Sequence, residues 1–241
     1  MNKGILYDIQ KYAANKKKMV SVLIDPDNRN FGQLTELLTL CNLKVIDFLL
    51  VGGSILGDGN IEETTEFIKE RSQIPVIIFP GTVQQISNKA DGILLLSLVS
   101  GRNADLLIGK HVESSFKLKS SGLEVMPTGY MLVDSGKQTT ASYISFTHPL
   151  PADKPMLAAA TALAAEQLGM KLLYLDGGSG AGNNIGADVI KKVKEHTSLP
   201  LIVGGGIKTR ESIAAAFEAG ADMVVIGTAL ENNPQLLNEL I

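Results

Sequence analysis

The chain has 241 residues, 45% of them apolar, and its 22 basic and 25 acidic side chains nearly cancel. The charges are spread along the chain without a basic block, so we expect no nucleic-acid partner. Cys41 is the single cysteine, which excludes an intramolecular disulfide and a thiolate metal cluster and fits a cytoplasmic protein.

The first residues, MNKGILYDIQKYAANKKK, have helical spacing but lack the apolar core of a signal peptide. No later apolar run approaches the ~20 residues of a transmembrane helix. We therefore expect no membrane-spanning segment. Residues 1–241 are predicted to form one domain, because single α/β barrels commonly have this length.

Short aliphatic runs, each followed by Gly, Pro, Asp or Ser, recur along the chain and are predicted strands. Nearly all are continuously apolar, which is typical of parallel strands buried on both faces. In chain order they are Val20–Asp25, Val45–Val51, Pro75–Phe79, Gly92–Ser97, Leu123–Thr128, Lys171–Asp176, Pro200–Gly204 and Asp222–Gly227.

Amphipathic helices are predicted between most of these strands, at Phe31–Leu43, Ile61–Ser72, Ala104–Ser120, Pro155–Leu168, Ala187–His196 and Thr209–Ala219. This alternation favours a closed (β/α)₈ TIM barrel. The third connection, GTVQQISNKAD, is too short for a full helix, so we expect a missing or shortened third helix and a thin wall there. The segment DSGKQTTASYISFTHPLPADK is expected to form a long polar loop, serving as a lid or pocket wall.

Barrel enzymes place their sites at the carboxyl ends of the strands. The residues at those ends are Asp25, Asp27, Gly52, Gly53, Ser54, Asp176, Ser179, Gly205, Gly206, Gly227 and Thr228. Glycine-rich segments follow the last three strands: GGSGAG, GGGI and a GT that precedes a short predicted helix. Glycines let backbone N–H groups converge on phosphate oxygens. Any one of these motifs could be a tight turn, but three in succession favour a phosphate site.

Two carboxylates close strands on the same side of the barrel. Asp25, with the Ser54 hydroxyl, offers the hard oxygen ligands that suit Mg²⁺. Asp176, next to the phosphate loops, suits a general base. The alternative for Asp25 is that it only caps the next helix, although Asp27 or Asn28 fits that role better.

The histidines are weaker candidates. His111 and His196 fall in predicted helices outside the barrel, where packed or solvated side chains are expected. His148 lies in the long fifth loop, where a functional role stays open.

Together the motifs LIDPDN, LVGGS, YLDGGSGA, LIVGGGIKT and VVIGTAL resemble, in this order, the geranylgeranylglyceryl phosphate synthase and heptaprenylglyceryl phosphate synthase family. YLDGGSGA and LIDPD are the selective ones. The short third connection is similar too, since this family lacks a regular third helix and leaves a groove for a prenyl chain.

The resemblance implies transfer of a polyprenyl group from its diphosphate to the C3 hydroxyl of sn-glycerol 1-phosphate. A geranylgeranyl donor is favoured over a C35 donor. Asp25 and Ser54 would hold Mg²⁺, and Asp176 would remove the hydroxyl proton. The implied glycerol phosphate residues are Tyr174, Leu175, Asp176, Gly177, Gly178, Ser179, Gly180, Gly205, Gly206, Gly227 and Thr228. We further expect brief contact with a membrane surface as the lipid product leaves, and a homo-oligomer.

Two positions depart from the family pattern. Asp176 stands where many relatives have Glu, and Leu23 stands where some archaeal relatives have Lys, so phosphate binding here would rely more on backbone amides. Two other functions stay open: a phosphosugar isomerase or epimerase, and a barrel that binds a phosphorylated ligand without chemistry.

Overall fold

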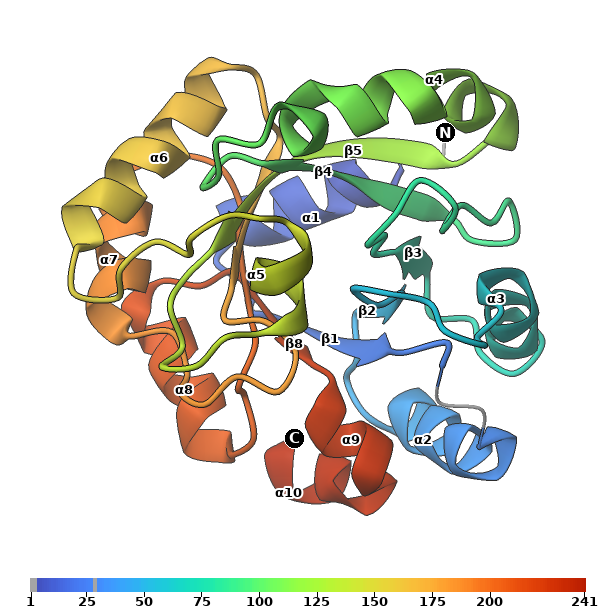
Figure 1. Cartoon of the computed structure of the whole chain (residues 1–241). Coiled ribbons are helices and arrows are strands. Elements are labelled where there is room, and N and C mark those ends of the chain that lie inside the picture. The colour runs from blue at the N-terminus through green and yellow to red at the C-terminus, as the bar shows by residue number, and fades with distance from the viewer. Residues whose placement is uncertain (1–3, 28–29) are drawn as a thin grey trace.

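A computed structural model of the protein describes residues 4–27 and 30–241. In these residues parallel strands close into a barrel in chain order, from β1 beside β2 round to β8 beside β1 (Figure 1). The strands are β1 (Met19–Ile24), β2 (Phe48–Val51), β3 (Val76–Ile78), β4 (Gly92–Leu98), β5 (Glu124–Leu132), β6 (Leu172–Asp176), β7 (Leu201–Gly204) and β8 (Met223–Ile226).

Helices surround the barrel, and α5 and α9 lie near its mouth. They are α1 (Ile5–Ala14), α2 (Phe31–Leu43), α3 (Ile61–Lys69), a π-helical turn (Asp105–Gly109) leading into α4 (Lys110–Ser121), α5 (Thr140–Ile144), α6 (Pro155–Gln167), α7 (Ala187–His196), α8 (Arg210–Ala219), α9 (Thr228–Asn232), a 3₁₀ turn (Pro234–Leu236) and α10 (Leu237–Leu240). Among the described residues, no helix combines the length and apolarity needed to cross a bilayer.

The predicted TIM barrel is confirmed, and the predicted strands and helices appear in the predicted order. Residues 79–91, all described, contain no helix, so the thin wall after β3 is confirmed too. One boundary matters for function. β5 was expected to end at Thr128 but continues to Leu132, because Tyr130 and Leu132 pair with Tyr174 and Asp176 of β6.

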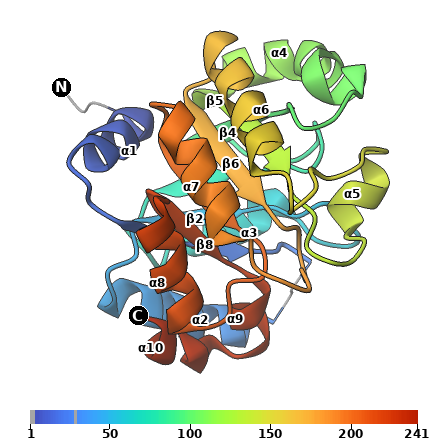
Figure 2. The ribbon, with the colours of Figure 1, turned by 90° about the vertical axis from the view of Figure 1, so that its left-hand side faces the viewer.

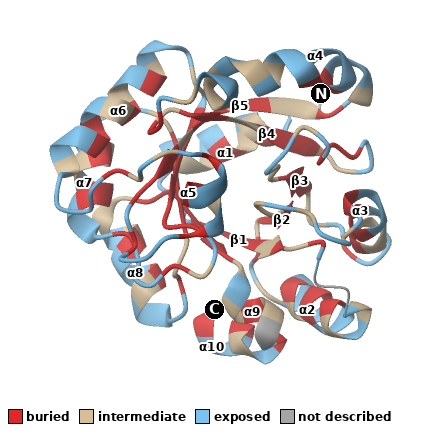
Figure 3. Ribbon diagram, viewed as in Figure 1, coloured by how far each residue is buried: buried red, intermediate tan, exposed pale blue. Residues whose placement is uncertain are grey.

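The apolar core has two layers. Alternate strand residues such as Leu50, Ile77 and Tyr174 fill the inside of the barrel, and α1 closes its lower end with Ile5 and Ile9. The other strand residues pack outward against the helices. Figure 2 shows α1 and α5 on opposite sides of the barrel, and Figure 3 shows buried strands inside helices whose outer faces are exposed.

The expected helix cap after β1 is corrected. Asn30 caps α2, since its side chain accepts the Gln33 N–H. Asp27 instead accepts the N–H groups of Gly57 at 2.9 Å and Gly59 at 2.6 Å, so it joins the loop after β1 to the loop after β2. Asn28, the other predicted cap, lies outside the described residues.

An aspartate before an even-numbered strand repeatedly binds the start of the preceding strand. Asp47, before β2, accepts from Lys17 and from the Val20 N–H of β1. Asp91, before β4, accepts hydrogen bonds from Lys69 and from the Val76 N–H of β3. Asp222, before β8, accepts hydrogen bonds from Lys194 and from the Leu201 N–H of β7. Each carboxylate thus satisfies a strand-end N–H and a lysine from the outer layer, holding neighbouring strands in register at the end opposite the mouth.

We expect Asp222→Ala to lower the free energy of unfolding by about 2–4 kcal/mol, because it leaves the buried Leu201 N–H without an acceptor and removes the carboxylate that pairs with the Lys194 ammonium, which keeps only the Leu199 carbonyl. Urea unfolding followed by circular dichroism measures this. Asp153→Ala removes an exposed pair with Lys154 and should change stability by less than about 0.5 kcal/mol. Equal effects of the two substitutions would contradict the stabilising role of Asp222.

Candidate active site

A cavity of about 770 Å³, including its open mouth, lies at the mouth of the barrel and is called the polar cavity here for its carboxyl groups and glycine turns. Predicted site residues from β1, β2, β6, β7 and β8 converge there, as the common direction of parallel strands requires. They are Asp25, Ser54, Tyr174, Asp176, Gly178, Ser179, Gly180, Gly205, Gly206, Gly227 and Thr228.

Asp176 ends β6 as a buried carboxylate, 7% exposed. Its Oδ2 accepts the Tyr130 hydroxyl at 2.5 Å and its Oδ1 accepts the Gly178 N–H at 2.7 Å. Burial raises the pKa of Asp176, and the hydrogen bonds from Tyr130 and Gly178 oppose that rise. The pKa of Tyr130 is strongly raised by burial and by the nearby Asp176 charge, so its hydroxyl stays a donor. Asp176 is therefore a carboxylate held in one orientation at the floor of the cavity.

Three aromatic rings support that floor. Phe79 stacks on Tyr174 with centroids 5.0 Å apart, and Tyr130 lies 5.7 Å from Tyr174. A Cβ at Gly204 would lie 2.3 Å from the Tyr174 hydroxyl oxygen, so glycine is required there. The packed rings fill the barrel interior beneath Asp176 and so close the bottom of the cavity.

Leu175 and Gly177, both predicted to bind glycerol phosphate, do not line the cavity. Side chains alternate along a strand, so Leu175 points away from the barrel axis and packs in the outer layer. Gly177 packs against Ala181 and the backbone of Gly205.

The glycine loops after β6 and β7 have a backbone that few other residues adopt. Gly178, Gly180, Gly205 and Gly206 have φ values of 85°, 66°, 83° and 77°. The Ser179 and Thr228 hydroxyls lie 3.3 Å apart and link the loop after β6 to α9. In these turns the glycine backbone lines the polar cavity without side chains over it, as an anion site requires.

Asp25 and Ser54 follow β1 and β2 and line the same cavity as the glycine loops. The Asp25 carboxylate packs against Gly53, where a Cβ would lie 3.0 Å from Oδ2, and accepts the Asp27 N–H at 3.0 Å. Burial is the main cause that raises the pKa of Asp25. Glu231 of α9 lines the same cavity, and burial followed by the Asp25 charge raises its pKa to about 7.

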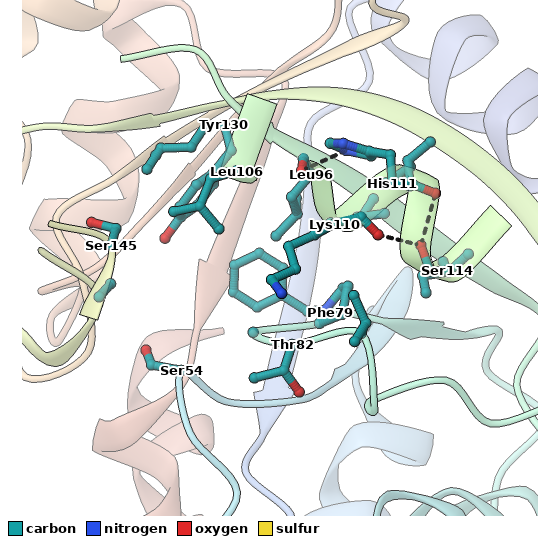
Figure 4. Close-up of a pocket in the computed structure, with 18 of the residues that line it drawn as sticks. Ser54, Phe79, Thr82, Leu96, Leu106, Lys110, His111, Ser114, Tyr130 and Ser145 are labelled. Carbon is teal, nitrogen blue, oxygen red and sulfur yellow. Dashed lines mark hydrogen bonds between the residues drawn. The ribbon is translucent and has the colours of Figure 1, made fainter. Parts of the chain in front are cut away.

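A second cleft, about 1050 Å³ including its open mouth, adjoins the polar cavity. It runs along the helix-free connection after β3 and below the π-helical turn and α4. Its walls are mainly apolar, including Val83, Ile86, Ile93, Leu95, Leu106 and Leu118. Figure 4 shows Ser54 and Tyr130 on one side of the cleft and His111 and Ser114 on the other.

The fifth loop contributes a wall to this cleft. Ala141, Ile144 and Ser145, in and next to α5, line it, so the expectation of a pocket wall is confirmed. Ser54, Phe79 and Tyr130 line both the cleft and the polar cavity, which makes them the boundary between the two.

The histidines are distributed as follows. His111 is packed in the cleft wall with Nε2 3.0 Å from the Leu96 carbonyl oxygen. His196 is exposed and contacts its own helix. His148 is exposed and lines neither cavity, so the structure does not bring it to the site.

Three residues of the site, Tyr130, Glu231 and Gln85, were not predicted from the sequence. The buried amide of Gln85 donates to the Gly53 carbonyl at 2.8 Å and accepts from the Gly81 N–H at 3.1 Å, so it holds the loop that carries Ser54. Tyr130 could have been found had β5 been extended, since every second residue of a barrel strand faces inward. Glu231 and Gln85 carry no local signal, because their roles depend on contacts distant in sequence.

Comparisons with known proteins agree with this geometry. The sequence profile of the PcrB family matches residues 12–241. Geranylgeranylglyceryl phosphate synthase of Spirosoma linguale is 50% identical over 232 residues, covering 96% of this chain and 93% of its own. The enzyme of that name from Pyrococcus furiosus is 40% identical over 218 residues, covering 90% and 86%.

Solved structures extend the comparison. The crystal structure of (S)-3-O-geranylgeranylglyceryl phosphate synthase from Thermoplasma acidophilum, in complex with sn-glycerol-1-phosphate, has a TM-score of 0.91 and 33% identity, covering 98% of this chain and 95% of that one. A tryptophan synthase α-subunit from Pyrococcus furiosus, 13% identical with a TM-score of 0.59, shares the fold alone. With the profile matching nearly the whole sequence and relatives of 40–50% identity spanning it, the chain belongs to the PcrB family.

Proposed function

We propose that the protein is a prenyltransferase that joins a polyprenyl group, geranylgeranyl by preference, to the C3 hydroxyl of sn-glycerol 1-phosphate. The observation that carries this proposal is the position of Asp176. It lies on a polar, glycine-rich cavity, and Tyr130, which donates to it, also lines the apolar cleft. A base at that boundary can serve a reaction between a small phosphorylated alcohol and a long hydrocarbon donor.

The polar cavity suits the acceptor. The glycine turns after β6 and β7 and the residues Gly227 and Thr228 surround one end of it, as phosphate binding requires. The second cleft is lined more by apolar side chains than the cavity that holds Asp25 and Asp176, and a phosphosugar would leave its apolar walls without a partner. The cleft therefore favours prenyl transfer over sugar isomerisation.

The apolar cleft suits the donor tail. Each CH₂ group removed from water contributes about 0.8 kcal/mol, so an apolar wall of this extent favours a long chain. The sequence-based expectation of a groove beside GTVQQISNKAD is supported by Val83 and Ile86, which come from that segment and line the cleft.

Two residues that line the polar cavity, Asp25 and Ser54, fit Mg²⁺, which we propose as the cofactor. Asp25 and Ser54 offer hard oxygen donors, and among the described residues no cation pairs with the Asp25 carboxylate. The described residues hold no cluster of three His, Cys, Asp or Glu side chains. A carboxylate and a hydroxyl, as Asp25 and Ser54 provide, are typical of a Mg²⁺ bound by few protein groups and by substrate phosphates. The metal would supply charge neutralisation for the leaving diphosphate.

In the proposed reaction the C3 oxygen of the acceptor forms a bond to C1 of the prenyl group while the bond from C1 to the diphosphate oxygen breaks. Asp176 takes the hydroxyl proton, and diphosphate leaves with the bonding electron pair. Tyr130 holds Asp176 by its hydrogen bond, so the free lone pairs of the carboxylate face the acceptor. The apolar walls keep water from the electron-poor prenyl carbon.

The expected homo-oligomer and the expected contact with a membrane surface stay predictions.

Labelled sn-glycerol 1-phosphate incubated with Mg²⁺ and C10, C15, C20 or C35 diphosphates should give a butanol-extractable product, with the KM for the diphosphate falling as its tail lengthens up to C20.

Ala141→Trp narrows the cleft and should raise KM for the C20 donor by about tenfold or more while changing KM for the acceptor little. Flat selectivity across the donors would argue against the cleft as the tail site, and absence of any product would argue against the function.

Asp25→Asn should lower turnover by about a hundredfold or more, because it removes the charged ligand proposed for Mg²⁺. Activity measured across a Mg²⁺ titration, and after chelation, checks this. Asp58→Asn alters an exposed aspartate in the loop after β2 and should leave activity unchanged. Full activity of Asp25→Asn, or of the chelated wild-type protein, would remove the metal assignment.

Tyr130→Phe removes a hydrogen bond that lowers the pKa of Asp176, so that pKa should rise further. The basic form of Asp176 is then lost at a higher pH on acidification, and the acid limb of the kcat profile should shift to higher pH. Tyr143→Phe, the same change at an exposed tyrosine of α5, should leave the limb in place. An unmoved limb in Tyr130→Phe would show that Asp176 does not control it.

A further inference from the structure

The polar cavity has an unusual charge balance for a site that takes a phosphate dianion. The carboxyl groups of Asp25, Asp176 and Glu231 line it, and the only cationic side chain among its lining residues is Lys208. Leu23, two positions before Asp25, also lines the cavity and adds no charge. Backbone amides carry only partial charges, so a nearby ammonium group would add to the attraction that they exert on a phosphate dianion.

Lys137 lies close to the glycine loop from outside the cavity. Its ammonium nitrogen is 3.8 Å from the point where a Cβ of Gly180 would stand, and its Cγ is 3.8 Å from the equivalent point at Gly182. A larger residue at either position would crowd the lysine. The side chain therefore extends along the loop and ends beside Gly180, which lines the cavity.

The backbone that carries Lys137 is bound to that same loop. The Ser135 carbonyl accepts the Asn183 N–H at 3.0 Å and the Asn183 side-chain amide at 3.2 Å. A Cβ at Gly178 would lie 2.6 Å from the Thr139 hydroxyl oxygen, so the segment also packs closely there. The start of the long loop after β5 is thus held against the phosphate loop after β6, which limits where the Lys137 ammonium can reach.

Neither lysine is engaged elsewhere. Within residues 4–27 and 30–241, no ion pair or hydrogen bond involves Lys137 or Lys208. Lys110 and the half-buried Lys192 differ in this respect, since each pairs with a glutamate on its own helix.

We propose that Lys137 and Lys208 flank the phosphate of the acceptor and determine specificity for a phosphorylated alcohol. Lys208 approaches it from the loop after β7 and Lys137 from the loop after β5. They supply the positive charge that the glycine amides lack, and they bind the acceptor phosphate, not the donor diphosphate. This inference rests on the proposed function and adds two specificity-determining residues to it.

The test uses the single variants Lys137→Met and Lys208→Met, the double variant, and Lys137→Arg. Each methionine should raise KM for sn-glycerol 1-phosphate about three- to tenfold, with the double variant near the product of the two and kcat at saturation little changed. KM for the prenyl diphosphate should stay as in the wild type. The salt dependence of the acceptor KM should weaken in the double variant, and Lys137→Arg should restore most of the affinity.

Lys191→Met, at an exposed position on α7, is the matched control and should change nothing. Binding is also measured without turnover, as the rise in melting temperature that glycerol 1-phosphate or inorganic phosphate causes in the absence of donor. If the wild-type protein shows no such rise, the acceptor assignment itself fails. If it does and the variants respond equally, or if the donor KM rises instead, the lysine proposal is overturned while the proposed function stands.

Discussion

The site depends on one buried carboxylate kept at a fixed place. Asp176 has little water around it, so its charge requires the Tyr130 hydroxyl and the Gly178 N–H. Tyr130 can reach it because β5 runs on to pair with the last residue of β6. Gly178 can turn its N–H back because glycine accepts a positive φ. The length of β5, the first glycine turn and the aromatic floor all follow from the need to hold that carboxylate.

The two cavities meet because the barrel is asymmetric. On the side of β6 to β8, complete helices back the strands, and glycine turns form the polar end. On the side of β3 and β4, a helix is missing, and the space it would fill becomes the apolar cleft. Gln85, within the helix-free connection, holds the loops after β2 and β3 together, since its buried amide bonds the Gly53 carbonyl and the Gly81 N–H. The helix-free connection thus provides both a wall of the binding space and a buried polar link.

The barrel could be predicted from the sequence because each of its units is local: an apolar run, a turn and an amphipathic helix. Asp25, Asp176 and the glycines were predictable because parallel strands bring their carboxyl ends together. Leu175 was misplaced because a motif was carried over whole, although strand alternation sends that side chain outward. Tyr130, Gln85 and Glu231 act through partners distant in sequence, and no local pattern reports such contacts. The same is true of Lys137, whose neighbour Gly180 lies on another loop.

The helix-free connection also has a consequence for motion. β3 consists of Val76–Ile78 and pairs with β4 through Ile77 with Gly92 and Ile78 with Ile93. β3 has three residues, and two of them pair with β4, so few ladder contacts are lost when these strands separate locally, which keeps the cost of opening low. Amide hydrogens at this seam should therefore exchange with solvent faster than those of β6 or β7. Local opening at this wall of the cleft would let a bulky hydrocarbon enter and leave while Asp176 keeps its hydrogen bonds to Tyr130 and Gly178.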